Sequence, residues 1–126
     1  MIDFKNGAFF KLKSSPNAYD REIAPFLVEG EVITDTFKAL RDGVVFTNKR
    51  IIAINTQGLA GTKKDFSSLP YAKIQAFSVE TAGLLESGVA DTELELYFSG
   101  LGKVKFEFNR GIDIKGICKT ISAYVL

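Results

Sequence analysis

The chain has 126 residues, 46% of them hydrophobic and 25% charged, and a net charge of +1, which is typical of one soluble globular domain. It contains no His, so the usual side chain for acid–base catalysis near neutral pH is missing. Its single cysteine, Cys118, excludes an internal disulfide and a cysteine-rich zinc site. No segment is apolar enough for a signal peptide or a membrane span, and there is no basic excess typical of a nucleic-acid binder. We therefore expect a cytoplasmic protein without a cofactor or a metal.

Residues 1–30 are expected to form a helical or irregular lead that packs on a domain formed by residues 31–126. The Ser-Ser-Pro run at 14–16 interrupts any long helix. Asn17 is a candidate N-cap for a short helix, and Asp20 then lies in the first turn, where the helix dipole favours negative charge. The lead is therefore predicted to contain one short helix.

The middle of the chain changes to a pattern of short strands. Five strands are expected in chain order, at 33–41, 44–47, 50–54, 62–66 and 74–79. The segment 50–54 is β-branched and almost wholly apolar, which predicts a central strand. Asp42-Gly43 and Asn48-Lys49 are expected to form tight turns, because glycine and asparagine accept the backbone angles of hairpin turns. A looser connection follows over 82–92.

The clearest pattern is a hairpin over residues 93–108, where apolar and polar side chains alternate on both sides of a glycine-containing turn. Both apolar sets must face one core, so the parity of the pairing excludes loops of two or four residues. We predict a three-residue loop, Gly100-Leu101-Gly102, which places Leu96 opposite Phe106.

The chain is expected to end in an amphipathic helix. Apolar residues recur at helical spacing from Ile114 to Val125, and Asp113 lies at the start, where the helix dipole favours it. Cys118 falls in the apolar stripe and is interpreted as a small buried side chain rather than a reactive thiol. The predicted fold class is mainly β with a C-terminal α-helix, which covers the open end of a nearly closed antiparallel sheet.

Six short motifs identify a family when they are taken together. They are GE at 30–31, KALRD at 38–42, VFTNKR at 45–50, GLAGTKK at 58–64, PY at 70–71 and SVETAG at 78–83. In this combination the chain resembles the bacterial pleckstrin-homology (PH) domain family, in particular its small stand-alone members, over roughly residues 17–126. The resemblance implies a seven-stranded, strongly bent antiparallel barrel or sandwich capped by a helix. It also implies ring-shaped homo-oligomers and no shared catalytic machinery.

Charge is unevenly distributed along the chain. Residues 38–64 contain six cationic side chains and one acidic one, whereas residues 80–102 contain five acidic side chains and no Lys or Arg. The candidate basic surface, for a ligand or a neighbouring subunit, consists of Arg41, Lys49, Arg50, Lys63 and Lys64. The candidate complementary acidic surface consists of Glu80, Glu86, Asp91, Glu93 and Glu95. An alternative interpretation is that these residues are solvated outer faces of strands.

The favoured function is a non-enzymatic scaffold or protein-interaction module that assembles with itself. Oppositely charged surfaces that meet head to tail close into rings when the rotation permits, and an open sheet edge adds backbone pairing. The expected partners are further copies of the chain and an unknown protein, and not nucleic acid. The alternative is a peripheral membrane or phosphate-ligand binding module, with weak membrane association of about 1 kcal/mol per basic residue. Acid–base catalysis by Glu93 and Glu95 is not expected, because both should face water.

Overall fold

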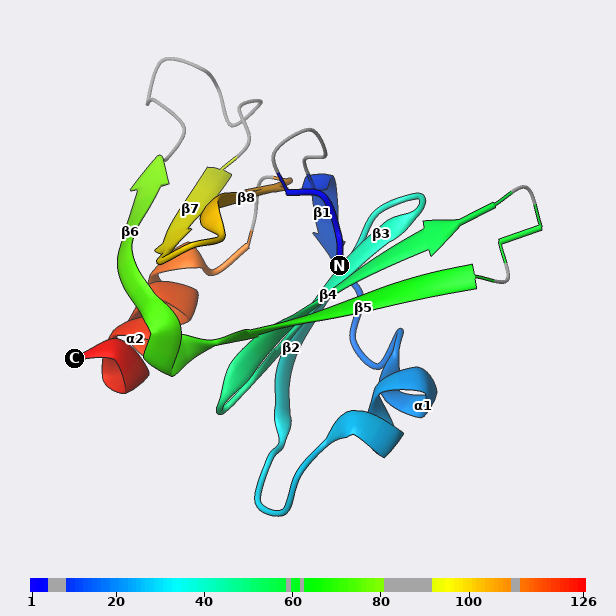
Figure 1. The fold of residues 1–126 in the computed structure, drawn as a ribbon, viewed down its shortest axis with the longest axis horizontal. Coiled ribbons are helices and arrows are strands. Elements are labelled where there is room, and N and C mark those ends of the chain that lie inside the picture. Colours follow the sequence, from blue (N-terminus) through cyan, green and yellow to red (C-terminus); the bar gives the residue numbers. More distant parts are fainter. Residues whose placement is uncertain (5–8, 59, 62, 81–91, 110–111) are drawn as a thin grey trace.

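The structure is a computed structural model that describes residues 1–4, 9–58, 60–61, 63–80, 92–109 and 112–126. These residues form one bent sheet with the strand order β5-β4-β3-β2-β1-β8-β7-β6, and Figure 1 shows its two halves facing each other. The strands are β1 (Phe9–Ser14), β2 (Ile33–Lys38), β3 (Asp42–Thr47), β4 (Arg50–Gln57), β5 (Lys63–Pro70), β6 (Ile74–Glu80), β7 (Thr92–Phe98) and β8 (Gly102–Phe108). The helices are α1 (Asp20–Ile23) and α2 (Ile114–Val125), and the 3-10 turns are η1 (Ala24–Phe26) and η2 (Tyr71–Lys73).

The main hydrophobic core lies between the two halves of the sheet. It joins Phe46 of β3 and Phe106 of β8 to Ile117 and Ile121 of α2, and all four side chains are buried. The Phe37 ring meets the Phe108 ring edge-on at 4.8 Å, a favourable geometry for aromatic pairs. The predicted β fold with a helix over the core is therefore confirmed. Neither described helix is long and apolar enough to cross a membrane.

A second core explains the apolar run at 50–54. Val45 of β3 and Ile52 and Ile54 of β4 point away from the main core and pack against Tyr19 and Ile23 beside α1. Strands buried on both faces read as continuous apolar runs rather than as alternating ones. The prediction that 50–54 is a central strand is confirmed, since β4 lies between β3 and β5.

The N-terminal lead contains a strand that the sequence did not predict. The expected short helix is present as α1, but β1 lies between β2 and β8, antiparallel to the first and parallel to the second. The described sheet therefore has eight strands rather than seven, and one parallel pair. β1 is irregular, with a register shift against β8 between Phe9 and Leu12. Asn17 is not the N-cap of α1, because Tyr19 occupies that position without a side-chain cap.

Two turn predictions are also corrected. The β2–β3 turn consists of residues 39–41, and Asp42 and Gly43 already belong to β3. In the β7–β8 hairpin the loop has three residues, as predicted, but they are 99–101, so Leu96 faces Val104 rather than Phe106. A register shift of two residues leaves every side chain on its own face, so the parity of the pattern cannot distinguish the two pairings.

The C-terminal helix begins at Ile114, where the sequence predicted it. The Asp113 carboxylate accepts a hydrogen bond from the Gly116 backbone N–H at 3.1 Å and so caps α2. Cys118 is half-buried rather than fully buried, and burial raises the pKa of its thiol. A raised pKa keeps the thiol protonated and less nucleophilic.

Candidate functional site

The five residues of the predicted basic surface lie at two ends of the sheet. Arg41 lies in the β2–β3 turn, and its guanidinium donates to the Gly58 carbonyl at 3.0 Å beside the start of β5, which carries Lys63 and Lys64. Lys49 and Arg50 lie at the β3–β4 turn, which Figure 1 shows at the opposite end of these strands. The structure does not bring the five cations together.

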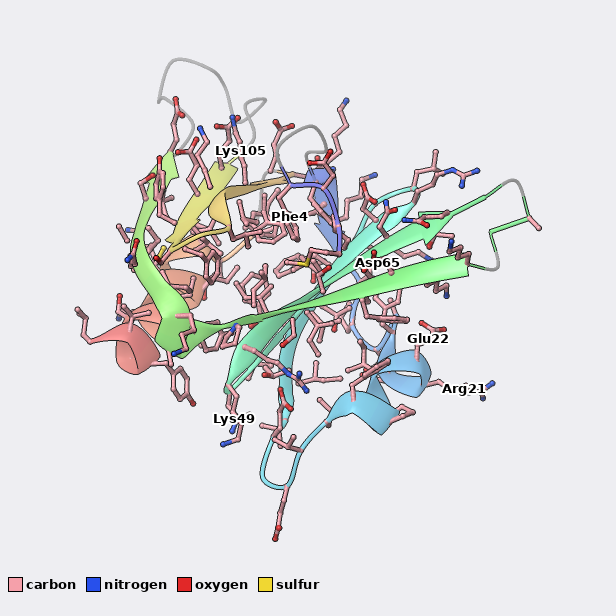
Figure 2. All side chains as sticks on the ribbon, viewed as in Figure 1. Phe4, Arg21, Glu22, Lys49, Asp65 and Lys105 are labelled. Atoms are coloured by element: carbon pink, nitrogen blue, oxygen red, sulfur yellow. The ribbon has the colours of Figure 1, made fainter. Side chains whose placement is uncertain are left out.

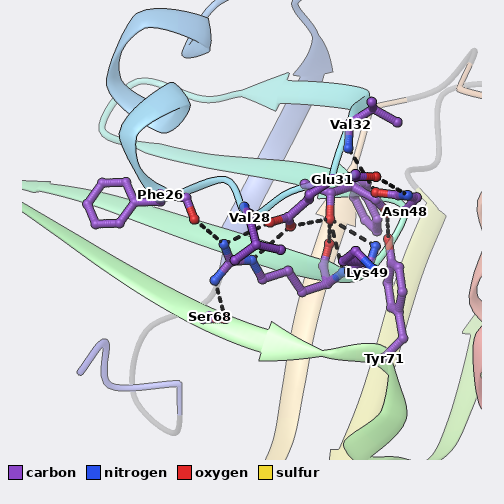
Figure 3. A network of polar contacts seen from close by, with 12 residues as sticks. Phe26, Val28, Glu31, Val32, Asn48, Lys49, Ser68 and Tyr71 are labelled. Carbon is purple, nitrogen blue, oxygen red and sulfur yellow. Dashed lines mark hydrogen bonds and ion pairs between the residues drawn. The ribbon is translucent and has the colours of Figure 1, made fainter.

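Arg50 is engaged inside the protein. Its guanidinium donates to the Glu31 carboxylate from Nε at 2.9 Å and from Nη2 at 3.0 Å. Further donations go to the Phe26 carbonyl at 2.6 Å and to the Ser68 hydroxyl at 3.1 Å, and Figure 3 shows this network. Because these bonds hold the guanidinium in place, Arg50 ties β4 to the chain before β2 and is not available to an external ligand.

Glu31 is the buried centre of this network. Its carboxylate also accepts from the Thr47 hydroxyl at 2.7 Å and from the Val28 backbone N–H at 3.0 Å. Burial alone would raise the pKa of Glu31, but the hydrogen bonds from Arg50, Thr47 and Val28, with the guanidinium charge, hold that pKa below its ordinary value. Glu31 is therefore ionised near neutral pH, and the network is a structural ion pair.

The predicted acidic surface is largely neutralised where the structure describes it. Glu93 pairs with Lys105 at 3.1 Å and Glu95 with Lys103 at 3.8 Å, both across the β7–β8 hairpin. The hydrogen bond and the charge of Glu93 raise the pKa of Lys105. Glu80 is exposed on β6. The other two predicted residues, Glu86 and Asp91, lie outside the described part of the chain.

A different set of cations converges on a pocket of about 580 Å³ between β1 and the β2–β3 turn. The pocket is lined by Lys11, Lys13, Lys38, Ala39, Leu40, Arg41 and Asp42. Lys13 and Lys38 are direct partners across the antiparallel β1–β2 pair. None of its three lysines, nor Arg41, forms an ion pair within the described residues. We call this site the basic pocket.

Two details of the basic pocket bear on its chemistry. The Asp42 carboxylate accepts a hydrogen bond from the Asn55 side-chain amide at 2.6 Å, so it is held by β4. The Lys38 ammonium lies 5.9 Å from the centre of the Tyr19 ring, within the range of a cation–π contact. Four cations thus face a single carboxylate, and the arrangement suits an anion.

Sequence reasoning missed Lys11 and Lys13 because the lead was expected to be helical or irregular. The available signal was the FFKLKS stretch at 9–14, which alternates apolar and basic residues for most of its length. The backbone departs from regular strand geometry at Lys11, where φ is 54°, but the alternation in the sequence continues through this residue. Arg41 was among the predicted basic residues, but nothing in the sequence showed that β1 lies beside it.

A second pocket, of about 330 Å³, lies between β2 and the start of α2. Asp35 and Asp113 both line it, and the pKa of Asp35 is raised by burial and by the charge of Asp113. Among the described residues, no group of three or more His, Cys, Asp or Glu side chains is placed to hold a metal ion. The basic pocket is therefore the stronger candidate site.

Comparison with known proteins places the chain in a family. A family model described as bacterial PH domain matches residues 3–125. The uncharacterized protein YjqA of Bacillus subtilis (strain 168) is 41% identical over 111 residues, which cover 86% of each chain.

Two solved structures are also similar. The first is a DUF1696 family protein with a pleckstrin-homology domain from Shewanella loihica PV-4, with 35% identity, a TM-score of 0.78, and coverage of 93% of this chain and 99% of that one. The second is a pleckstrin-homology domain from Shewanella amazonensis SB2B, with 38% identity, a TM-score of 0.64, and coverage of 96% and 93%. With a family model that spans nearly the whole chain and relatives of this identity, the protein belongs to the bacterial pleckstrin-homology domain family.

Proposed function

We propose that the protein is a non-enzymatic interaction module that assembles with further copies of itself. The observation that carries the proposal is the open sheet, in which β5 and β6 are the end strands and each has one sheet neighbour. Within the described residues, no backbone hydrogen bond covers the outer side of either strand. An uncovered edge is a template for pairing with another chain.

The two edges differ in side chains, which favours a head-to-tail contact. On β6, Gln75, Ala76 and Ser78 are small or polar and exposed, so little hinders the approach of a second strand. Beside β5, the half-exposed Phe26 ring lies 4.9 Å from the Phe66 ring. A contact between two unlike edges repeats from copy to copy and closes into a ring when the rotation permits.

Charge contributes less to this contact than the sequence predicted. Lys64 lies 3.7 Å from Glu22, and Glu93 and Glu95 pair within their own hairpin. Lys63 on β5 and Glu80 on β6 are exposed and have opposite charge. The outer edges of β5 and β6 therefore support the proposed self-assembly more strongly than the charges do.

Light scattering after size-exclusion chromatography tests the proposal. We expect a mass several times the 13.8 kDa of one chain. Ala76→Lys places a charge on the β6 edge and should lower the mass toward that of one chain, because lysine on an edge opposes strand pairing. The matched control is Ala123→Lys on the exposed face of α2, which should leave the mass unchanged. A monomeric wild-type protein would overturn the proposal.

A second candidate function, binding of a phosphate group or an anionic membrane, is favoured by one specific observation. The basic pocket gathers four cations and has a single carboxylate, which is already held by Asn55. This candidate does not require self-assembly.

A further inference from the structure

We propose that the start of β2 and the first turns of α2 form a groove that binds an extended segment of a partner protein, with a Lys or Arg side chain of that segment between Asp35 and Asp113. The groove shares no lining residue with the basic pocket, and none of its residues belongs to β5 or β6. The inference therefore goes beyond self-assembly and stands whether or not the chain assembles with itself.

The first argument is the incomplete pairing of β2. The β1–β2 register ends at Ser14 and Phe37, and one further backbone bond runs from the Ser15 N–H to the Thr36 carbonyl at 2.9 Å. The chain then turns away toward α1, so no backbone partner from the described part of the chain covers residues 33–35 on this side. An uncovered stretch of strand backbone accepts an added strand from another chain.

The second argument is the space beside this stretch. The pocket of about 330 Å³ lies between β2 and α2, and another pocket of about 150 Å³ lies between β2 and the chain that follows β1. Because Ser14 and Asp35 line both of them, the two pockets adjoin at these residues. Pro16 forms part of one wall, and Thr120 of α2 forms part of the other. Together the two pockets follow the uncovered edge of β2.

The third argument is charge, which selects a cationic side chain. Asp35 and Asp113 line the same pocket, and neither forms an ion pair within the described residues. Burial and the charge of Asp113 raise the pKa of Asp35, so the two carboxylates repel each other. No described Lys or Arg lines either pocket. An ammonium or guanidinium group between the carboxylates replaces repulsion with charge-assisted hydrogen bonds.

The fourth argument favours a peptide over a free cation. Thr120 lines the charged pocket, and Tyr124 lies one helical turn further along the same face of α2. The Tyr124 ring stacks on the Tyr71 ring at 5.4 Å and is half-exposed. A free cation uses only the carboxylates. An extended peptide also pairs with the backbone of β2 and lays an apolar side chain on Tyr124, so we commit to the peptide.

Selection from a displayed library of short random peptides tests the charge preference. The wild-type protein should enrich peptides that carry Lys or Arg at one fixed position. Asp35→Lys should instead enrich peptides with Asp or Glu at that position, because the substitution reverses the charge at the exposed start of β2. The matched control Glu29→Lys makes the same change at an exposed residue outside both pockets and should enrich the wild-type peptides. Absence of any common peptide, or the same basic peptides on Asp35→Lys, would overturn the proposal.

Binding of an enriched peptide, measured by fluorescence anisotropy, tests the contact without reversing a charge. Asp35→Asn should weaken binding about tenfold, because it removes one charge-assisted hydrogen bond, whereas Glu29→Gln should leave binding unchanged. Urea denaturation of each variant shows that the fold is retained. Equal affinities of Asp35→Asn and the wild-type protein would overturn the role of Asp35.

Hydrogen exchange locates the bound peptide. Exchange of the backbone amides should slow at residues 33–35 and in the first turns of α2, and it should not change in the outer strands β5 and β6. Slower exchange confined to β5 or β6 would overturn the groove as the binding site. An N-acetyl-lysine amide that binds as tightly as the peptide would overturn the peptide assignment, because it supplies the cation without the strand.

Light scattering on the same samples keeps this result distinct from self-assembly. A monomer that binds the peptide contradicts only the assembly proposal. An oligomer that enriches no peptide contradicts only the groove.

Discussion

The two ends of the β2–β5 half of the sheet hold their cations in opposite ways. At the β3–β4 turn, Arg50 meets the buried Glu31 carboxylate, and its guanidinium also donates to Phe26 and Ser68. Lys49, next to it, points to solvent, and Figure 2 shows it at the rim of the molecule. At the other end, the four cations of the basic pocket have no ion-pair partner among the described residues. A positive charge alone therefore does not identify a ligand-binding residue. The interactions that the charged group already makes within the protein distinguish a structural cation from one that is available to a ligand.

The difference follows from burial. A buried carboxylate needs a partner, because desolvation without one is costly, so the Glu31–Arg50 pair is part of the fold. Exposed lysines are screened by water and salt, so the basic pocket can hold unmatched charge without unfolding the protein. Substitutions at the β3–β4 turn should therefore change the stability of the fold, and substitutions at the basic pocket should change ligand binding.

The largest expected effect is at the Glu31 network. Arg50→Ala leaves the Glu31 carboxylate buried without its cation and should lower the free energy of unfolding by about 3 kcal/mol. Urea denaturation at neutral pH measures the change. Lys49→Ala, one residue away and exposed, should change stability by less than about 0.5 kcal/mol. Similar effects of the two substitutions would contradict the structural role of Arg50.

Packing, rather than charge, should dominate stability next to the basic pocket. A Cβ on Gly43 would overlap the Tyr19 ring, so Gly43→Ala should cost about 2 kcal/mol of unfolding free energy. In a Tyr19→Ala background the same substitution should cost much less, because the overlapping ring is gone. Equal costs in both backgrounds, measured by urea denaturation, would show that α1 does not pack on β3 as described.

The pH dependence of stability should differ between the wild-type protein and Arg50→Ala. The pKa of Glu31 is held below its ordinary value of 4.5, so its contribution is fully present above that pH and is lost as the pH falls toward the lowered value. The stability difference between the two proteins should therefore shrink on acidification below about pH 4.5. A constant difference between pH 7 and pH 3 would show that the ionised carboxylate is not the partner of Arg50.

The smallest expected effect on stability is a gain rather than a loss. Lys13→Gln removes half of the like-charge pair across β1 and β2 and leaves the Lys38–Tyr19 contact in place, and it should raise the free energy of unfolding by roughly 0.5 kcal/mol at low salt. Salt should abolish the gain by screening, while binding to anionic vesicles falls. Thermal unfolding at two salt concentrations measures the change, and a destabilised variant would contradict the unfavourable contact.

Sequence reasoning predicted the parts of the fold that local patterns determine. The apolar run at 50–54, the periodicity of 114–125 and the position of Asp113 at the start of that helix are confirmed. It did not predict features that depend on which strands pair and in which register. β1 was missed because its alternation at 10–13 is short and is followed directly by the Ser-Ser-Pro run at 14–16, and the β7–β8 register was misplaced by two residues, a shift that the pattern cannot detect.

The site was only partly predictable for the same reason. Arg41 was predicted as part of a basic surface, but Lys49 and Arg50 were grouped with it because they are near in sequence. Antiparallel strands place successive turns at alternate ends of a sheet, so neighbours in the sequence become distant in the fold. The partner of Arg50, nineteen positions away at Glu31, carries no local signal.

A nuclear magnetic resonance titration tests the contrast between the two ends most directly. Backbone ¹H–¹⁵N spectra would be recorded while a soluble short-chain phosphatidylglycerol is added. We predict chemical-shift changes at Lys11, Lys13 and residues 38–42, and none at Lys49 or Arg50. Changes centred on Lys49 and Arg50, or no changes at the basic pocket, would contradict the assignment of binding to one end and structure to the other.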